Sequence, residues 1–243
     1  MRKRHRPLDF SNTGGINIPG NEPKLVRLLI LRTLFELGCS SHLLKEHCFD
    51  HDGIALFLGL GEGEQEYNRK KALTILRKQY KLAESTADEA WQLSPALEAN
   101  LRAIQALVGF TELECRLLVF FTLMHSEHLL AHVCIHWLDD ISTQASFTVL
   151  ATLLAVEKQQ VIQALSSNGK LMRCGLVSIE QGSRYGLLQR FDLLSGAFAD
   201  KLMSSEANAE DFLMEMVKPG KKPTLAACDY RHIQRQYDLL GNY

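Results

Sequence analysis

The sequence lacks any pair of cysteines spaced as CxxC, although the chain of 243 residues contains six cysteines. Zinc-binding motifs usually contain such pairs, and disulfide frameworks are typical of secreted chains. We therefore expect no structural zinc site, and thiols that are reduced and mostly buried. The six cysteines are Cys39, Cys48, Cys115, Cys134, Cys174 and Cys228.

Long hydrophobic runs and a strong net charge are absent as well. The longest apolar runs, residues 28–31 and 117–121, are far shorter than the roughly 20 residues of a membrane-spanning helix. The basic start, residues 1–6, is not followed by the apolar core of a targeting sequence. A formal net charge of −1 gives no overall attraction to nucleic acid or to an anionic membrane. These absences predict a cytoplasmic protein with no membrane partner.

The motifs of common catalytic and nucleotide-binding sites are also missing. There is no GxSxG around a nucleophilic serine, and no cysteine has the local context of a catalytic thiol. The glycine-rich stretch at residues 59–63 lacks the lysine and Ser/Thr of a P-loop, and Glu62, Glu64 and Glu66 would repel a phosphate. The chain is therefore predicted to have no catalytic residue and no cofactor of its own.

Helical periodicity is the main pattern that the sequence does contain. Residues 1–20 are interpreted as a flexible basic tail, and residues 21–106 as a helical N-terminal region. Asn21 and Pro23 are typical of a helix start, and Gly38 of a helix end. A later helix, over residues 66–82, has a basic surface formed by Arg69, Lys70, Lys71, Arg77, Lys78 and Lys81.

A capping box marks the start of the most apolar helix of the chain. Thr111 and Glu114 are three residues apart, so each side chain can bond the backbone N–H of the other. The helix that follows is apolar nearly all round, which predicts a central position.

Residues 146–188 have the order of a winged helix: helix, tight turn, helix, then a short β-hairpin. The first helix ends near Ala155, and the second ends at residues 168–169. The hairpin is predicted to pair residues 175–179 with residues 185–188 around a turn at residues 181–183. Residues 191–203 are predicted as one further helix. The fold class is thus mainly α, with a helical region packed on a winged-helix domain at residues 107–203.

Four histidines follow one another at spacings of three and four residues, within and just before a helix predicted over residues 126–137. Such spacings place imidazoles on one helical strip and include the i, i+4 spacing of helical metal ligands. The pattern favours a solvated polar face, because no HExxH order is present. A metal-binding protein is a remote alternative. The four residues are His125, His128, His132 and His136.

Winged helices often bind DNA, but this one has few cations for phosphate contacts. The second helix contributes Lys158, with Gln159 and Gln163 as side chains able to bond base edges. Lys170, Arg173, Arg184 and Arg190 add positive charge around the hairpin. A protein-docking surface is the favoured interpretation, and a DNA-binding regulator is the alternative. The candidate interaction residues are Lys158, Gln159, Gln163, Lys170, Arg173 and Arg184.

Residues 107–243 resemble the N-terminal region of a group of large bacterial AAA-family ATPases. The resemblance lies in residues 110–118, in the winged-helix stretch and in residues 230–243. It implies that residues 204–243 form a helix and a linker to an ATPase domain, with ATP and Mg²⁺ bound only by that longer parent. This chain contains no GxxxxGK[ST]. The resemblance thus implies a non-catalytic adaptor region that recognises a protein substrate or partner.

Overall fold

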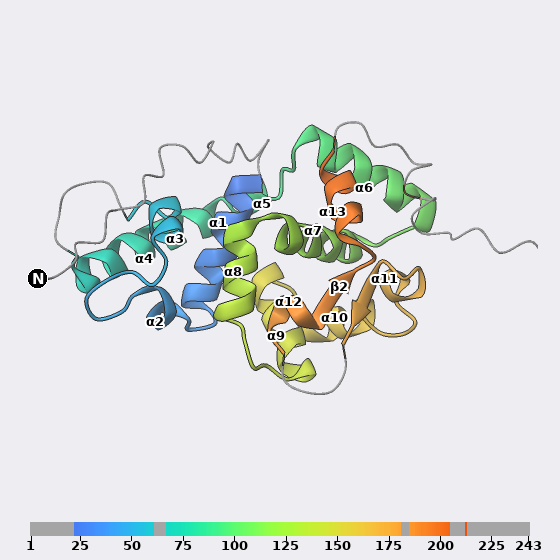
Figure 1. Ribbon diagram of the computed structural model, residues 1–243. Coiled ribbons are helices and arrows are strands. Elements are labelled where there is room, and N and C mark those ends of the chain that lie inside the picture. The colour runs from blue at the N-terminus through green and yellow to red at the C-terminus, as the bar shows by residue number, and fades with distance from the viewer. Residues whose placement is uncertain (1–21, 61–66, 181–184, 205–211, 213–243) are drawn as a thin grey trace, which may run out of the picture.

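The computed structural model describes residues 22–60, 67–180, 185–204 and 212. These residues are mainly helical, which confirms the predicted fold class at that level (Figure 1). The N-terminal half contains α1 (Glu22–Phe35), α2 (Ser40–Leu43), α3 (Asp52–Phe57), α4 (Arg69–Ser85), α5 (Ala87–Ala90), α6 (Pro95–Val108) and α7 (Glu112–Ser126). The remainder contains α8 (His128–His136), α9 (Thr143–Leu154), α10 (Lys158–Ala164), α11 (Lys170–Arg173), β1 (Val177–Ile179), α12 (Leu187–Arg190), β2 (Phe191–Leu193) and α13 (Gly196–Met203).

Helix α1 lies in the middle of the molecule, next to α4, α5, α8 and α9 (Figure 1). It has Pro23 in its first turn, where a missing N–H costs nothing. Its leucines are almost completely buried, which explains why its apolar positions do not form a narrow stripe. Gly38, with φ of +73°, follows the helix end in a left-handed conformation that suits glycine.

The capping box of α7 is present as predicted. Thr111 Oγ1 accepts a hydrogen bond from the Glu114 N–H at 3.2 Å, and Glu114 Oε2 accepts one from the Thr111 N–H at 2.9 Å. Helix α7 is buried over most of its length and contacts α8, α10, α11, α13 and β2. The predicted central position is therefore confirmed.

Two predicted helices, α9 and α10, are joined by a short turn. Ala155 has φ of +52° and ends α9, and Glu157 caps α10 through a box with Gln160. The two helices pack on each other, and α10 also packs on α7. This pair has the helix–turn–helix order that the sequence predicts.

The predicted hairpin is wrong in its second strand. β1 pairs antiparallel with β2, and Val177 faces Leu193 in the register. Residues 187–190 instead form α12, while Tyr185 makes an isolated bridge to Ile141. The burial pattern gives the reason, because Leu187 and Arg190 are buried at the i, i+3 spacing of a helix, whereas buried and exposed residues alternate in β2. The helix predicted over residues 191–203 is therefore shorter than expected. Residues 191–193 form β2, and the observed helix, α13, starts at Gly196.

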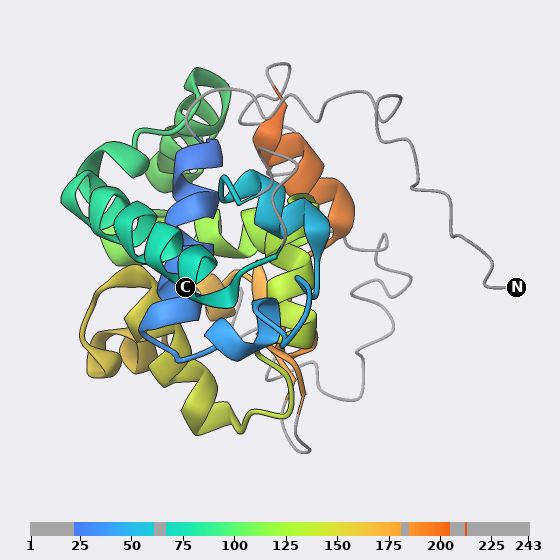
Figure 2. The same cartoon turned by 90° about the vertical axis from the view of Figure 1, so that its left-hand side faces the viewer.

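One hydrophobic cluster includes residues of both predicted regions, 21–106 and 107–203. Helix α13 packs on α6 and α7, and α9 packs on α1. Figure 2, turned by 90° from Figure 1, shows α1 enclosed by helices from both parts of the chain. The winged-helix assignment and the boundary near residue 107 stay predictions.

Several predicted features lie outside the described residues. They are the basic tail at residues 1–20, Asn21, the turn at residues 181–183, Arg184, Cys228 and most of residues 204–243. Among the described helices, none alone is long and apolar enough to cross a membrane. Helices α7 and α8 together have such a length and composition, but their axes are bent by 95°.

Candidate functional site

The predicted interaction residues of the helix–turn–helix lie on α10 and α11. Gln159 and Gln163 are exposed on α10, and Lys158 is partly exposed at its start. Arg173 is exposed at the end of α11. Lys170 is different, because its Nζ donates a hydrogen bond to the Gly109 carbonyl. Its backbone N–H also donates to Glu114 Oε1 at 2.9 Å. Its ammonium therefore helps to hold α11 at the start of α7.

Arg190, counted in the sequence among the charges around the hairpin, is completely buried. Its Nη1 donates to Thr143 Oγ1 and to the Glu180 carbonyl, each at 2.9 Å, and its Nη2 donates to the Ile141 carbonyl at 2.7 Å. The guanidinium carbon lies 5.5 Å from the centre of the Tyr185 ring. The arginine thus joins the start of α9 to the segment after β1. It adds no positive charge to the exposed surface.

A groove lies between α4 and the α9–α10 turn, with α1 at its base. Its volume is about 710 Å³. The lining side chains come from four helices and the turn, and most of them are polar. They are Arg32, Glu36, Tyr80, Glu84, Thr148, Ala151, Thr152, Ala155, Val156, Glu157 and Gln160.

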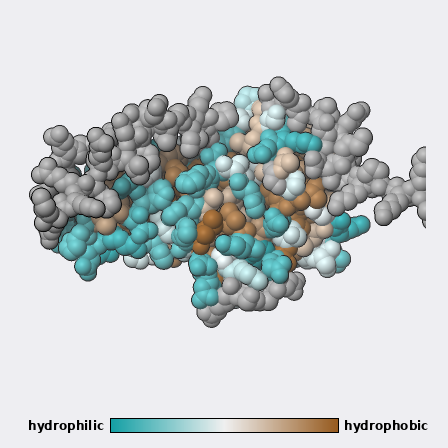
Figure 3. Space-filling view, in the orientation of Figure 1, coloured by the Kyte–Doolittle hydropathy of each residue, from teal (hydrophilic) through white to brown (hydrophobic). Residues whose placement is uncertain are grey.

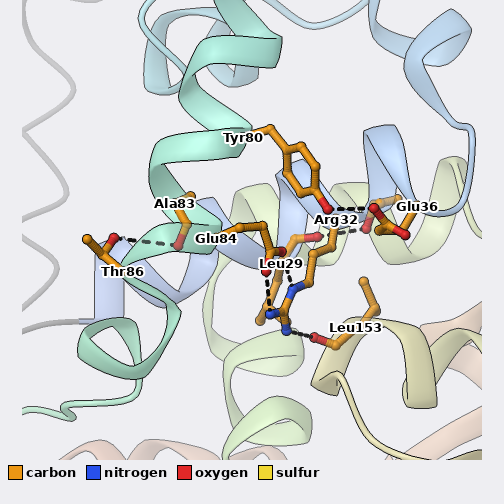
Figure 4. Close-up of polar contacts among 9 residues, drawn as sticks. Leu29, Arg32, Glu36, Tyr80, Ala83, Glu84, Thr86 and Leu153 are labelled. Carbon is orange, nitrogen blue, oxygen red and sulfur yellow. Dashed lines mark hydrogen bonds and ion pairs between the residues drawn. The ribbon is translucent and has the colours of Figure 1, made fainter.

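Arg32 forms the base of this groove and joins three helices (Figure 4). Its Nε and Nη2 donate to the two carboxylate oxygens of Glu84 at 2.6 and 3.0 Å, and its Nη1 donates to the Leu153 carbonyl at 2.7 Å. The Arg32 side chain is 6% exposed and that of Glu84 is 32% exposed. A bidentate pair of this kind fixes both direction and distance, so α1, α4 and α9 are held in one arrangement.

Tyr80 and Glu36 form a second polar contact on the same wall (Figure 4). The Tyr80 hydroxyl donates to Glu36 Oε1 at 2.5 Å, and the ring stacks on Phe35 with centroids 5.1 Å apart. Burial, then the hydrogen bond to Glu36 and the charges of Glu84 and Glu36, raises the pKa of Tyr80 to about 12. The phenol therefore stays protonated and acts as a hydrogen-bond donor at the groove.

The charges around the groove are unequal. Three carboxylates line it, those of Glu36, Glu84 and Glu157, and Arg32 is the one cation among the lining residues. Arg32 already neutralises Glu84. Glu36 and Glu157 are exposed, which leaves two negative charges facing an open groove. Such an arrangement can bind a cationic side chain, since opposite charges in a partly desolvated groove attract each other more than in water.

The four histidines do not share one strip. His125 belongs to α7, where its Nε2 lies 3.2 Å from the Phe191 carbonyl oxygen. His128, His132 and His136 belong to α8, whose axis is bent by 95° from that of α7. The helix predicted from about residue 126 to 137 is present as α8, but the single strip of four imidazoles is wrong, because extended backbone at Glu127 ends α7 and begins α8.

A fifth histidine, His51, packs against the strip of α8. Its ring centre lies 4.3 Å from that of His132 and 6.3 Å from that of His128, while His132 and His136 are 4.4 Å apart. His51 Nδ1 accepts the Ile54 N–H at 3.1 Å and so caps α3. A neutral His51 in this role carries its proton on Nε2, which cannot then bind a metal. Within the described residues, no three His, Cys, Asp or Glu side chains are arranged to hold a metal ion.

The described cysteines are all free thiols. Cys39, Cys115 and Cys134 are buried as expected, whereas Cys48 is exposed and Cys174 is partly exposed. Burial raises the pKa of Cys115 to about 11, with the charge of Glu114 as a further cause, and burial alone raises the pKa of Cys134. These two thiols are thus kept protonated, which disfavours a role as nucleophiles.

No protein family, curated protein or solved structure matches this chain. The groove is a feature that reasoning from the sequence missed, because its residues come from four separate helices. One local signal was present, since Arg32 follows the apolar run of residues 28–31 in α1 and is itself buried.

Proposed function

We propose that this chain is a non-catalytic recognition domain that binds a basic segment of a partner protein in the groove between α4 and α10. One observation carries this proposal: two exposed carboxylates, Glu36 and Glu157, line a groove whose lining cation, Arg32, is already paired with Glu84. A partner that brings a lysine or arginine would supply the missing positive charge.

The chemistry of the walls favours a peptide over a small anion. A phosphate or carboxylate would meet the charges of Glu36 and Glu157 and be repelled. A lysine or arginine can bury its methylene stem against Ala155 and Val156 while its charged head reaches a carboxylate. Gln160 and Thr152 offer further donors and acceptors for a peptide backbone.

The wider role rests on the resemblance to the N-terminal regions of AAA-family ATPases. If the resemblance holds, the groove selects a protein substrate or partner. An ATPase domain of the longer parent protein then binds ATP and Mg²⁺ and supplies the force. This part of the proposal is tested by the gene itself, because a reading frame that continues past Tyr243 into a Walker A motif supports it. A reading frame that ends without such a motif contradicts it.

The groove is tested by peptide binding measured calorimetrically at low and moderate salt. The probe is a 12-residue peptide rich in lysine and arginine, compared with the same peptide in which every cation is glutamine. We expect the basic peptide to bind and the double variant Glu36→Gln, Glu157→Gln to bind it roughly tenfold more weakly, since each exposed ion pair contributes up to about 1 kcal/mol.

The matched control is Glu46→Gln, Glu180→Gln, which changes the net charge equally at two exposed positions outside the groove. This control is expected to keep wild-type affinity. Equal losses in both double variants would mean that only net charge matters, and the groove proposal would then be wrong. Failure of the basic peptide to bind at low salt would also contradict it.

A further inference from the structure

Helix α4 has an unusually one-sided charge. Of its 17 residues six are basic, and its one acidic residue, Glu84, is paired with Arg32. The helix rests on α1 through the face that contains Ala72 and Leu76. At about 100° per residue the opposite face is centred on exposed Thr74. Around Thr74 lie Lys70, Lys71, Arg77, Lys78 and Lys81, all exposed.

Most of the cations on this face are not paired with an acid of the described residues. Lys70, Arg77, Lys78 and Lys81 have no ion pair or side-chain hydrogen bond there. Arg77 and Lys81 are also at the i, i+4 spacing, where like charges destabilise a helix. Basic residues in the first turn are unfavourable too, because the helix dipole is positive at that end. An external anionic partner would relieve all of these repulsions.

We infer that this basic face of α4 binds the phosphate backbone of duplex nucleic acid. From Lys70 to Lys81 the face is about 16 Å long, at 1.5 Å per residue. A duplex of that length carries roughly ten phosphates, one per about 1.7 Å of axis. A rigid row of lysines and arginines along one helix face can therefore contact several phosphates at once. Such contacts position a protein on a duplex without reading its sequence.

Two other anionic partners fit this face less well. A helix that lies in a membrane surface inserts its apolar face, but the apolar face of α4 is already buried against α1. At the end that carries α2, α3 and α4, the described surface left uncovered in Figure 3 is mainly hydrophilic. A protein partner usually requires aromatic or large apolar anchors at the centre of the interface. The centre of this face is Thr74, and the exposed large apolar residue of α4, Leu82, lies in the last turn of the helix.

This nucleic-acid surface is distinct from the groove and from the predicted recognition helix α10. Around α10 and α11, Arg190 is buried and the Lys170 ammonium is bonded to Gly109, so only a few cations remain exposed there. The inference therefore goes beyond the proposed function and does not depend on it.

The experiment measures binding of the full chain to a fluorescent 20-base-pair duplex of arbitrary sequence, by anisotropy over a range of salt concentrations. The test variant is Lys70→Gln, Arg77→Gln, Lys81→Gln, and the matched control is Arg102→Gln, Lys158→Gln, Arg173→Gln, at three cations outside α4. Glutamine is nearly as good a helix former as lysine and arginine, so folding is expected to persist. The wild type is expected to bind at low salt, and the slope of log affinity against log salt becomes shallower by about 2.7 in the α4 variant, about 0.9 for each lost contact.

The control is expected to keep the wild-type slope. Three results would overturn the inference: no duplex binding at low salt, an unchanged slope in the α4 variant, or a loss confined to the control. Binding to vesicles of anionic lipid or to a poly-glutamate peptide, without duplex binding, would also overturn it. If the triple variant does not fold, Thr74→Glu places one negative charge at the centre of the same face and is expected to weaken duplex binding at least severalfold.

Discussion

Arg32 and Glu84 connect α1 to α4 through two parallel hydrogen bonds, of 2.6 Å from Nε to Oε1 and 3.0 Å from Nη2 to Oε2. The same guanidinium bonds the Leu153 carbonyl at the end of α9. One arginine thus links a helix of the predicted N-terminal region to the first helix of the predicted helix–turn–helix. Both partners, Arg32 and Glu84, also line the groove between α4 and α10.

Arg32→Met is expected to lower the free energy of unfolding by about 3 kcal/mol, since breaking a buried pair leaves its partners without a donor. Glu84→Leu is expected to cost a similar amount because Arg32 then loses its counter-charge. The double variant is expected to cost clearly less than the sum of the two, which urea unfolding of all four proteins measures. The pair Arg102 and Glu98 is the control, as it is exposed on α6 and should be worth under about 1 kcal/mol. Simple additivity for Arg32 and Glu84 would show that they are not coupled.

Arg190 offers a second stability prediction, because its role is structural rather than that of a surface cation. Arg190→Met removes the donors that serve Thr143, Ile141 and Glu180, so three part-buried hydrogen bonds of one guanidinium are lost. We expect a loss of about 3 kcal/mol in the free energy of unfolding, because hydrogen bonds to a charged group contribute roughly 1.5–3 kcal/mol each. Arg190→Lys should recover less than half, since one ammonium cannot donate in the directions of a planar guanidinium.

Arg173→Met is the matched control for Arg190, as Arg173 is exposed on α11. Its loss is expected to stay within about 0.5 kcal/mol. Equal stabilities of Arg173→Met and Arg190→Met in urea would contradict the buried network.

Local signals in the sequence were sufficient for most of the helices. The Thr111–Glu114 box predicts the start of α7, because both partners of the cap lie within one turn. The end of α9 near Ala155 is likewise encoded in a few neighbouring residues. The second strand was mispredicted because residues 185–188 and 191–193 are both short segments with apolar side chains at their ends. Only the distant pairing of Val177 with Leu193 distinguishes them.

The candidate site was less accessible to prediction than the helices. Lys158, Gln159 and Gln163 were correctly expected on one helix, but the groove beside them depends on α1 and α4, more than 70 residues earlier in the chain. Charge alone also misled, since Arg190 and Lys170 count as surface cations in a sequence. In the fold their donors bond carbonyl groups. Burial and tertiary hydrogen bonds decide which charges reach a partner.

His132 gives a prediction about acid. Its Nε2 is buried and has no hydrogen-bond partner among the described residues. Burial, then the neighbouring imidazoles of His51, His136 and His128, lowers the pKa of His132 to about 4, against the opposing effect of Asp50. The unfolded chain, with a pKa near 6.5, therefore binds this proton more readily than the fold. The contribution of His132 to stability is complete above about pH 6.5 and is lost as the pH falls toward 4.

The measurement is the urea midpoint at several pH values between 7.5 and 4.5, for the wild type and for His132→Leu. The wild-type midpoint is expected to fall steeply through this window. That of His132→Leu should fall less, because a leucine has no proton to gain and fills a similar buried volume. His47→Leu is the control, since His47 is exposed and should leave the pH profile unchanged. Parallel profiles for the wild type and His132→Leu would mean that the acid sensitivity of the fold originates elsewhere. His132 would then be a passive packing residue rather than one whose neutral state holds His51 against α8.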